Sequence, residues 1–202
     1  MKNEGILISE CNQPLQEADI KNEAVNLLIF KNGNEVTGNT LLTECPAQID
    51  YLLEGLIPRK GQGALAGGSD IGKSTLLRQL AMSISTKEKL FLGLWNINAK
   101  YNSVLCVCTE DDRSAIAFLL KKQSANYKPE QLNDLRFLFE YEDLYNELDK
   151  ALTRKKADLL IMDCFADAYA GDLKDTQQIR IFLNKFQKLI VKHDSKGSCF
   201  FY

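Results

Sequence analysis

The residues best suited to chemistry form a run of nine that contains three glycines, a lysine and adjacent hydroxyl side chains. The run matches the pattern G-x-x-x-x-G-K-[ST] without a gap and consists of Gly67, Gly68, Ser69, Asp70, Ile71, Gly72, Lys73, Ser74 and Thr75. Glycines let a backbone wrap closely around a phosphate, with its N–H groups converging on the anion at the start of a helix. An apolar segment precedes the run and a helical pattern follows it, which argues against a chance match. The run therefore predicts a nucleotide site.

Individual residues of this loop have distinct expected roles. Lys73 would reach the β- and γ-phosphates of the nucleotide as a point charge. Ser74 would place its hydroxyl on Mg²⁺, with Thr75 as a supporting neighbour. Asp70 is unusual here, because a carboxylate opposes the phosphate charge unless it points outward.

Carboxylates follow two other apolar segments. Asp163 ends the run 159–162 in the Walker B form and is expected to hold Mg²⁺, through a water. Glu110, Asp111 and Asp112 follow the apolar segment 103–109, where an acid could orient and deprotonate an attacking water. Glu110 is the first candidate for that role and Asp111 the second. Helix capping is the alternative for Asp111 or Asp112, and we expect Glu110 to be catalytic and Asp112 to cap.

Weaker signals lie nearby. Three acidic residues that follow Asp163 could form a second metal site or a solvated acidic loop, namely Asp167, Asp172 and Asp175. Asp175 would then cap the helix that follows. The one histidine, His193, is expected to cap the end of a long helix. Two alternating cysteines, Cys106 and Cys108, belong on one face of a buried strand.

Segments that alternate between strand and helix patterns must position these residues. Strands are predicted at residues 64–66, 103–109, 135–140, 158–163 and 198–202. Helices are predicted at 73–85 and 113–122, around 144–152, and around 179–190 from apolar residues at helical spacing. Strands that are apolar throughout indicate a parallel sheet covered on both faces, an α/β fold. Its ligands would lie at the carboxyl ends of the strands, where the motifs fall.

Composition narrows the class of protein. Of the 202 residues, 45% are hydrophobic and 26% are charged. The formal net charge of −2 argues against a broad basic face for nucleic acid. No apolar run approaches the roughly 20 residues of a membrane helix, and the N-terminus lacks a signal-peptide pattern. The six cysteines are scattered, as in cytoplasmic proteins. We expect no membrane association and a cytoplasmic location. Residues 1–45 form a weakly patterned N-terminal arm, in which 27–34 could be a strand entering a turn.

Together, these motifs resemble a known family. Four segments look like the RecA-type ATPases of the RepA-like group. They are the run 51–58, the loop 67–74, the strand ending in Glu110-Asp111, and Asp163 with the acidic segment 165–172. These are AAA-domain proteins carried by plasmids and mobile elements. The resemblance covers residues 46–202, which are expected to form one RecA-like P-loop domain.

The resemblance implies Mg²⁺-ATP binding and catalysis by Glu110 at a strand end. It also implies a homo-oligomer, a hexameric ring in which a neighbour supplies a basic finger and loops bind single-stranded DNA. In this family the strand after the long helix typically ends in a histidine that senses the γ-phosphate. Here that strand is 198–202, the last segment of the chain, so we expect a domain that is incomplete at its C-terminus.

Three functions follow as hypotheses. The first is a helicase-like ATPase that acts on DNA in the replication or mobilisation of a mobile element. The second is a RecA-like nucleotide switch that binds a protein partner without translocation, which the acidic pI of about 5.6 favours. The third is a small-molecule kinase, which the scarcity of arginine disfavours, because such a kinase usually has an arginine-rich lid that holds phosphates. No two arginines are adjacent among Arg59, Arg78, Arg113, Arg136, Arg154 and Arg180.

Overall fold

The computed structural model describes residues 36–46, 48–58, 60–139, 141–169, 171–172, 174–193 and 197–201, the last segment as backbone only. The chain divides into two units at residues 47 and 48. The described part of the first unit holds one short helix, α2 (Gly38–Thr43), which Thr37 caps by accepting a hydrogen bond from the Thr40 N–H. The predicted strand and turn at 27–34 lie outside the described residues. Among the described helices, none has the length and apolar character needed to cross a membrane.

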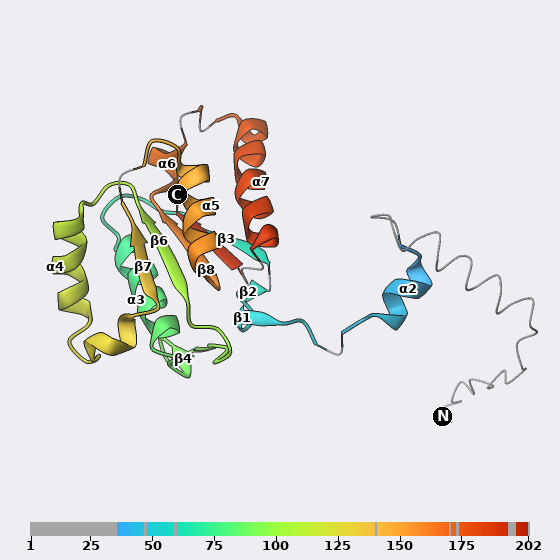
Figure 1. Ribbon diagram of the computed structural model, residues 1–202, viewed down its shortest axis with the longest axis horizontal. Helices are drawn as coiled ribbons and strands as arrows, with labels where there is room; N and C mark the ends of the chain where they lie inside the picture. The colour runs from blue at the N-terminus through green and yellow to red at the C-terminus, as the bar shows by residue number, and fades with distance from the viewer. Residues whose placement is uncertain are drawn as a thin grey trace, which may run out of the picture. The chain divides into compact units, whose positions relative to one another are not determined.

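A five-stranded parallel sheet forms the centre of the second unit (Figure 1). Its strands are β3 (Gly61–Leu65), β6 (Val104–Cys108), β7 (Leu135–Leu138), β8 (Leu159–Asp163) and β9 (Gly197–Phe201). Their order across the sheet is β3-β9-β8-β6-β7. All five predicted strands are present, although β3 begins three residues before the predicted position. Because β9 separates β3 from β8, the strand before the phosphate loop and the strand before Asp163 are not neighbours.

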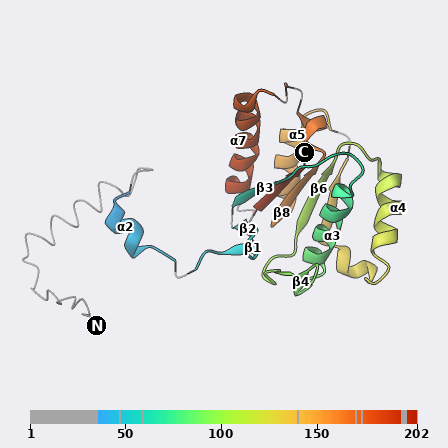
Figure 2. The ribbon, with the colours of Figure 1, turned by 180° about the vertical axis from the view of Figure 1, so that it is seen from behind.

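Helices cover both faces of the sheet (Figure 2). α3 (Lys73–Ser85) and α4 (Arg113–Gln123) lie on one side, with a short 3-10 helix (Pro129–Leu132) after α4. α5 (Leu144–Arg154), α6 (Phe165–Ala168) and α7 (Thr176–Lys192) lie on the other. α3 has the predicted bounds, and the other predicted helices are confirmed within a few residues.

The central strands alternate between two hydrophobic clusters. In β8, Leu159 and Ile161 join the cluster around α3, while Leu160 and Met162 join the cluster around α5 and α7. The same alternation in β6 sends Cys106 to the α3 side. Cys106 and Cys108 are both buried, as predicted. Strands buried on both faces are fixed in register, because a slip by one residue would exchange the two side-chain sets.

Helix ends follow the predicted caps where these were assigned. Asp112 accepts a hydrogen bond from the Ala115 N–H at the start of α4, and Asp175 accepts from two N–H groups at the start of α7. His193 is the C-cap residue of α7, and its Nε2 lies 2.6 Å from an Asp149 carboxylate oxygen on α5. These contacts confirm the capping predictions and tie α7 to α5.

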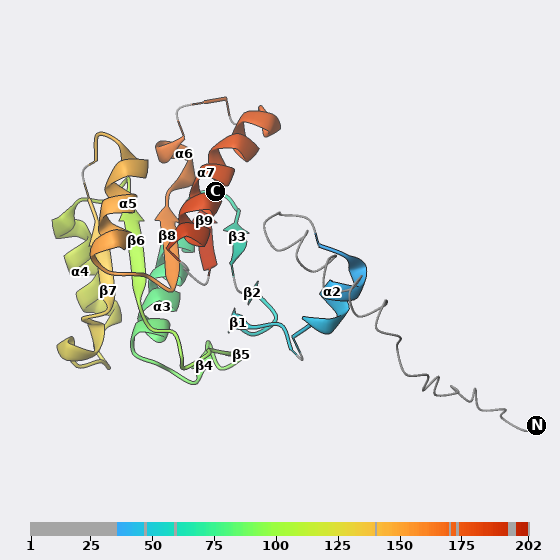
Figure 3. The ribbon, with the colours of Figure 1, turned by 45° about the vertical axis from the view of Figure 1, so that its right-hand side comes forward.

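Two small hairpins were not predicted from the sequence. β1 (Tyr51–Leu53) pairs with β2 (Ile57–Pro58), and β4 (Leu90–Phe91) pairs with β5 (Trp95–Asn96), both antiparallel (Figure 3). Each contains a strand of only two residues, too short for a periodic pattern to mark it. Trp95 packs against the α3-side cluster.

Candidate nucleotide-binding site

The phosphate loop has the backbone angles that an anion-binding nest requires. Asp70 and Gly72 take left-handed angles, with φ of +61° and +86°, and left-handed residues within such a turn direct successive N–H groups toward one concave side. Gly72 is also the N-cap of α3 and offers no side chain to its first turn. At Gly67, a Cβ atom would lie 2.5 Å from Cδ1 of Ile71, so a larger residue would require the exposed Ile71 side chain to move. The loop is therefore shaped to present N–H groups to an anion.

Lys73 reaches back across this loop. Its Nζ donates hydrogen bonds to the carbonyl oxygens of Gly67, at 3.0 Å, and Gly68, at 2.6 Å. A lysine ammonium carries three donors on a flexible stem, so the same group can serve phosphate oxygens placed in the loop.

Ser74 and Asp163 meet across the intervening strand β9. The Ser74 hydroxyl donates a hydrogen bond of 3.0 Å to Oδ1 of Asp163. Oxygen ligands at right angles, each about 2.1 Å from Mg²⁺, lie about 3 Å apart. The two side chains therefore fit neighbouring positions around a Mg²⁺ ion, one directly and one directly or through a water.

Burial governs the electrostatics of Asp163. Burial raises the pKa of its carboxyl group, and the Ser74 hydrogen bond and the nearby Arg78 guanidinium oppose that shift. Arg78 is itself buried on α3 and donates to the side-chain oxygen of Gln123. A buried carboxylate gains more from a bound cation than an exposed one does, because little water competes for it.

Glu110 lies in the same pocket as the phosphate loop. This pocket has a volume of about 480 Å³, and its lining includes Lys73, Ser74, Glu110 and Cys164. Asp111, the second candidate for the water-activating acid, lines the adjacent pocket of about 340 Å³ instead. Glu110 lines this adjacent pocket too. Asp112 is the cap of α4, as expected, and the catalytic role of Glu110 stays a prediction.

Thr109 forms hydrogen bonds that link the segment bearing Glu110 to the segment bearing Asp163. Its backbone N–H donates to the carbonyl oxygen of Asp163 at 3.0 Å. Its hydroxyl accepts from the Cys164 N–H at 2.7 Å and is directed toward Oδ2 of Asp167 at 3.3 Å. Glu110, Cys164 and Asp167 also place one ligand-type atom each within 4.8 Å of one another.

Sequence reasoning missed Thr109, Cys164 and Arg78, and considered Asp167 only together with Asp172 and Asp175, as a second metal site or a solvated acidic loop. Asp175 belongs to the cap of α7, and Asp172 accepts a hydrogen bond from the Lys174 N–H within its own turn. The acidic run 167–175 is thus divided between local turns and the site. A signal for Arg78 was available, because its position falls among the apolar residues of the buried face of α3.

Comparison with known proteins gives the family. A family described as an AAA domain matches residues 34–198. The chain belongs to this AAA domain family. Among solved structures, it is similar to a KaiC-like protein from the hyperthermophilic archaeon Pyrococcus horikoshii. That likeness has a TM-score of 0.50 at 18% identity and covers 77% of this chain and 70% of the other. Among curated proteins, no sequence matches.

At this level of identity the structural likeness defines the fold alone, a RecA-like P-loop core. The AAA domain family and this fold together support a nucleotide-binding ATPase. They confirm the α/β class, the RecA-like fold and the AAA-domain type of family expected from the sequence, and the RepA-like group stays a prediction.

Proposed function

We propose that this AAA domain protein binds Mg²⁺-ATP at the loop 67–75 and hydrolyses it. The observation that supports this most directly is the hydrogen bond between Ser74 and Asp163, in a pocket that Lys73 and Glu110 also line. The groups that we propose to bind phosphate, hold the cation and activate water thus follow three different strands, β3, β8 and β6, at the carboxyl ends of the sheet's strands.

Each side chain has a defined task in this proposal. The loop N–H groups and Lys73 bind and orient the β- and γ-phosphates. Ser74 and Asp163 hold Mg²⁺, which when bound neutralises charge on the phosphate oxygens. Glu110 orients a water for attack on the γ-phosphate and accepts its proton. Thr109 and the cap residue Asp112 hold the segment on which Glu110 lies.

We further propose that hydrolysis is coupled to DNA transactions, in the replication or mobilisation of a plasmid or mobile element. The support is the resemblance of four ordered motifs to the RepA-like group, whose members act as helicase-like hexamers on single-stranded DNA. In this proposal the chain works in the cytoplasm as a homo-oligomer, and hydrolysis switches the contacts between a subunit, its neighbour and DNA.

Two observations favour a second candidate, a nucleotide-dependent switch that binds a protein partner without translocation. The pocket beside Glu110 is lined by Asp111 and Asp112 as well, and the chain carries a net charge of −2. Acidic surfaces repel the phosphate backbone of nucleic acid.

Turnover measurements test both candidates. ATP hydrolysis by the full chain is measured with and without single-stranded DNA, using Glu110→Gln as the inactive variant and Asp111→Asn as its matched control. The motor proposal expects DNA to stimulate turnover, and Glu110→Gln alone to abolish it. Turnover that ignores DNA refutes the motor and supports the switch.

Binding is tested separately. Lys73→Ala should weaken ATP binding at least tenfold, because it removes the one lysine among the residues that line the phosphate pocket. Lys121→Ala, at an exposed position in the last turn of α4, should leave it unchanged. Equal affinity in wild type and Lys73→Ala refutes the assignment of the site.

A further inference from the structure

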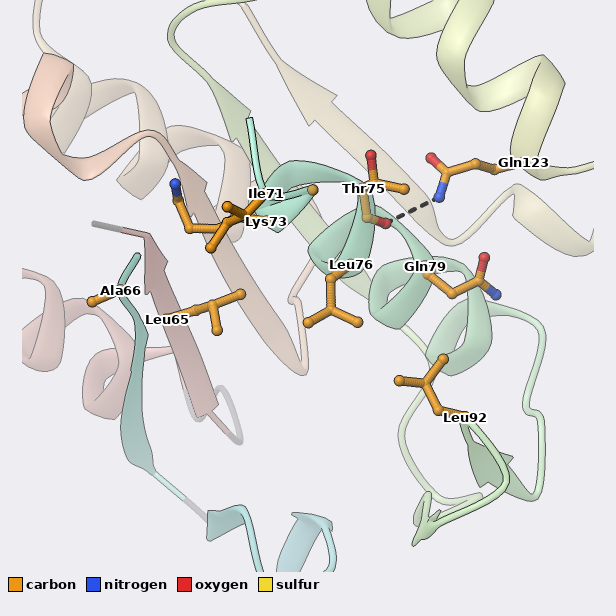
Figure 4. Close-up of a pocket in the computed structure, with 10 residues that line it drawn as sticks. Leu65, Ala66, Ile71, Lys73, Thr75, Leu76, Gln79, Leu92 and Gln123 are labelled. Carbon is orange, nitrogen blue, oxygen red and sulfur yellow. Dashed lines mark hydrogen bonds between the residues drawn. The ribbon is translucent and has the colours of Figure 1, made fainter. Parts of the chain in front are cut away.

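A second pocket begins at the phosphate loop and follows α3 away from it (Figure 4). It has a volume of about 430 Å³, and its lining includes Gly72, Lys73 and Thr75, which also line the phosphate pocket. The two pockets are therefore contiguous. A ligand whose phosphates lie in the first could extend the rest of its structure into the second.

The walls of this groove are mainly apolar. Its apolar side chains come from β3, the loop, α3 and the β4–β5 hairpin, namely Leu65, Ile71, Leu76 and Leu92 (Figure 4). Ile71 and Leu92 are more than half exposed, so part of their apolar surface is available to a ligand. A flat aromatic ring gains free energy when it covers such surface.

Two glutamines supply the polar groups farther along the groove, but one is already committed at both ends. The Gln123 side-chain oxygen accepts from Arg78 at 2.8 Å, and its nitrogen donates to the Thr75 carbonyl at 3.0 Å. These two bonds hold Gln123 in the wall of the groove and use one of the two N–H groups of its amide.

Gln79 is held differently, by a chain of hydrogen bonds with a fixed direction. A Glu88 carboxylate oxygen can only accept, so the Tyr127 hydroxyl, 2.6 Å away, must donate to it. The Tyr127 oxygen then accepts from the Gln79 amide nitrogen at 3.1 Å. Burial and the bond to Glu88 raise the pKa of Tyr127, which keeps its proton in place. The Gln79 nitrogen also donates to the Ser83 hydroxyl at 3.4 Å. These bonds assign the nitrogen to Tyr127 and Ser83 and leave the carbonyl oxygen as the acceptor that Gln79 can offer in the groove that it lines.

We infer that this groove is the base subsite of the nucleotide site and that the Gln79 carbonyl selects a purine with an amine at C6. This means adenine in preference to hypoxanthine or guanine, which carry a carbonyl oxygen at C6. The inference rests on the proposed function, in which the triphosphate lies in the loop 67–75. It goes beyond that function by naming the residues that recognise the base.

The selectivity has a simple physical cause. The amine at C6 of adenine donates to the Gln79 oxygen. Guanine and hypoxanthine carry a carbonyl oxygen at that position, which would face a second acceptor and leave both groups without a partner. For Gln79 to present its nitrogen instead, its bond to Tyr127 would have to break.

Competition binding with a closely matched ligand pair tests this inference. ATP and inosine triphosphate differ at C6, where an amine is replaced by a carbonyl. Wild type should bind ATP about tenfold more tightly, the ratio expected for one hydrogen bond whose loss leaves groups unpaired. Gln79→Leu should lose about tenfold in ATP affinity and leave inosine triphosphate affinity unchanged. Tyr127→Phe, which releases the Gln79 amide, should bring the ratio of ATP affinity to inosine triphosphate affinity close to one.

Three controls separate this inference from the proposed function. Tyr145→Phe removes a tyrosine hydroxyl on the opposite side of the sheet and should retain the ratio. Inorganic tripolyphosphate, which has no base, should compete equally in wild type and Gln79→Leu and fail to bind Lys73→Ala. Circular dichroism verifies folding, and Gln79→Leu keeps the test valid if Tyr127→Phe does not fold.

The outcomes are distinct. Failure of tripolyphosphate and both nucleotides to bind wild type refutes the phosphate site itself. Binding of both nucleotides with equal affinity refutes only the base subsite. A wild-type preference for ATP that persists in both Gln79→Leu and Tyr127→Phe also refutes the assignment to Gln79.

Discussion

Replacing Thr109 with valine removes one hydroxyl from the centre of the candidate site while keeping the shape of the side chain. The Cys164 N–H, which donates to that hydroxyl at 2.7 Å, would lose its acceptor. Leaving a fully buried donor without a partner costs about 1–3 kcal/mol, and because this bond is part-buried that range is an upper limit. The contacts toward the Cys164 carbonyl and the Asp167 carboxylate, at 3.2 and 3.3 Å, would be lost as well.

That cost should appear mainly in turnover, because Thr109 immediately precedes Glu110 and does not line the phosphate pocket. If all of it falls on the geometry for attack, kcat drops by between about 5-fold and 150-fold, since each 1.4 kcal/mol is tenfold. Nucleotide affinity should change by less than about twofold. The free energy of unfolding in urea should fall by about 1–3 kcal/mol.

Steady-state ATP hydrolysis and equilibrium nucleotide binding measure these two effects separately. Thr109→Ser keeps the hydroxyl and should restore kcat to within about threefold of wild type. Thr153→Val is the matched control, because it loses an exposed hydroxyl bond to the Asp149 carbonyl on α5. Full turnover in Thr109→Val, or equal losses in the valine and serine variants, would refute the positioning role of Thr109.

Three further predictions address the cation, the thiol and the fold. Burial raises the pKa of Asp163, and Mg²⁺ needs the ionised carboxylate. Mg²⁺-dependent binding of ATP should therefore be lost on acidification at a higher pH than the usual aspartate pKa of about 3.9 implies. A pH titration of Asp163→Asn should show no such loss. The raised pKa also means that this group favours folding while protonated, a contribution lost as pH rises through its folded pKa. Cys164 lines the phosphate pocket, so ATP should slow its alkylation severalfold, as mass spectrometry can measure, while exposed Cys45 reacts at the same rate. Asp175→Ala should lower the free energy of unfolding by about 1 kcal/mol through loss of the α7 cap, without changing ATP affinity; a larger loss of affinity than of stability would contradict its purely structural role.

The elements with long, regular patterns could be predicted from the sequence. α3 has apolar residues at helical spacing behind a glycine-rich loop, and β8 is apolar up to Asp163, so local patterns determine both. The hairpins β1–β2 and β4–β5 could not be predicted this way. Their strands are two or three residues long, and pairing with each other defines them more than any periodic pattern does.

The candidate site was predictable in its separate parts and not in its assembly. Lys73, Ser74, Glu110 and Asp163 each follow from a local motif. The contact of Thr109 with Cys164 depends instead on β6 and β8 being neighbours, with Cys108 opposite Asp163, and one sequence does not reveal strand order. The same limit applies to the groove along α3, where Gln79 and Tyr127 are 48 residues apart.

The position of β9 has a mechanical consequence for this site. Within the described sheet, β3 is joined by hydrogen bonds to β9 alone, through five residue pairs, and β9 is joined in turn to β8. On the side of β3, a force on the phosphate loop therefore passes into the sheet through a single strand, whereas on its other side it passes through the packing of α3 on the sheet and through the Ser74–Asp163 bond. Pulling along the strands loads all five pairs together, whereas pulling across them opens the pairs one at a time. The loop thus resists tension along the strands and yields most easily to a sideways pull, which would separate the lysine-bearing half of the site from its acidic half.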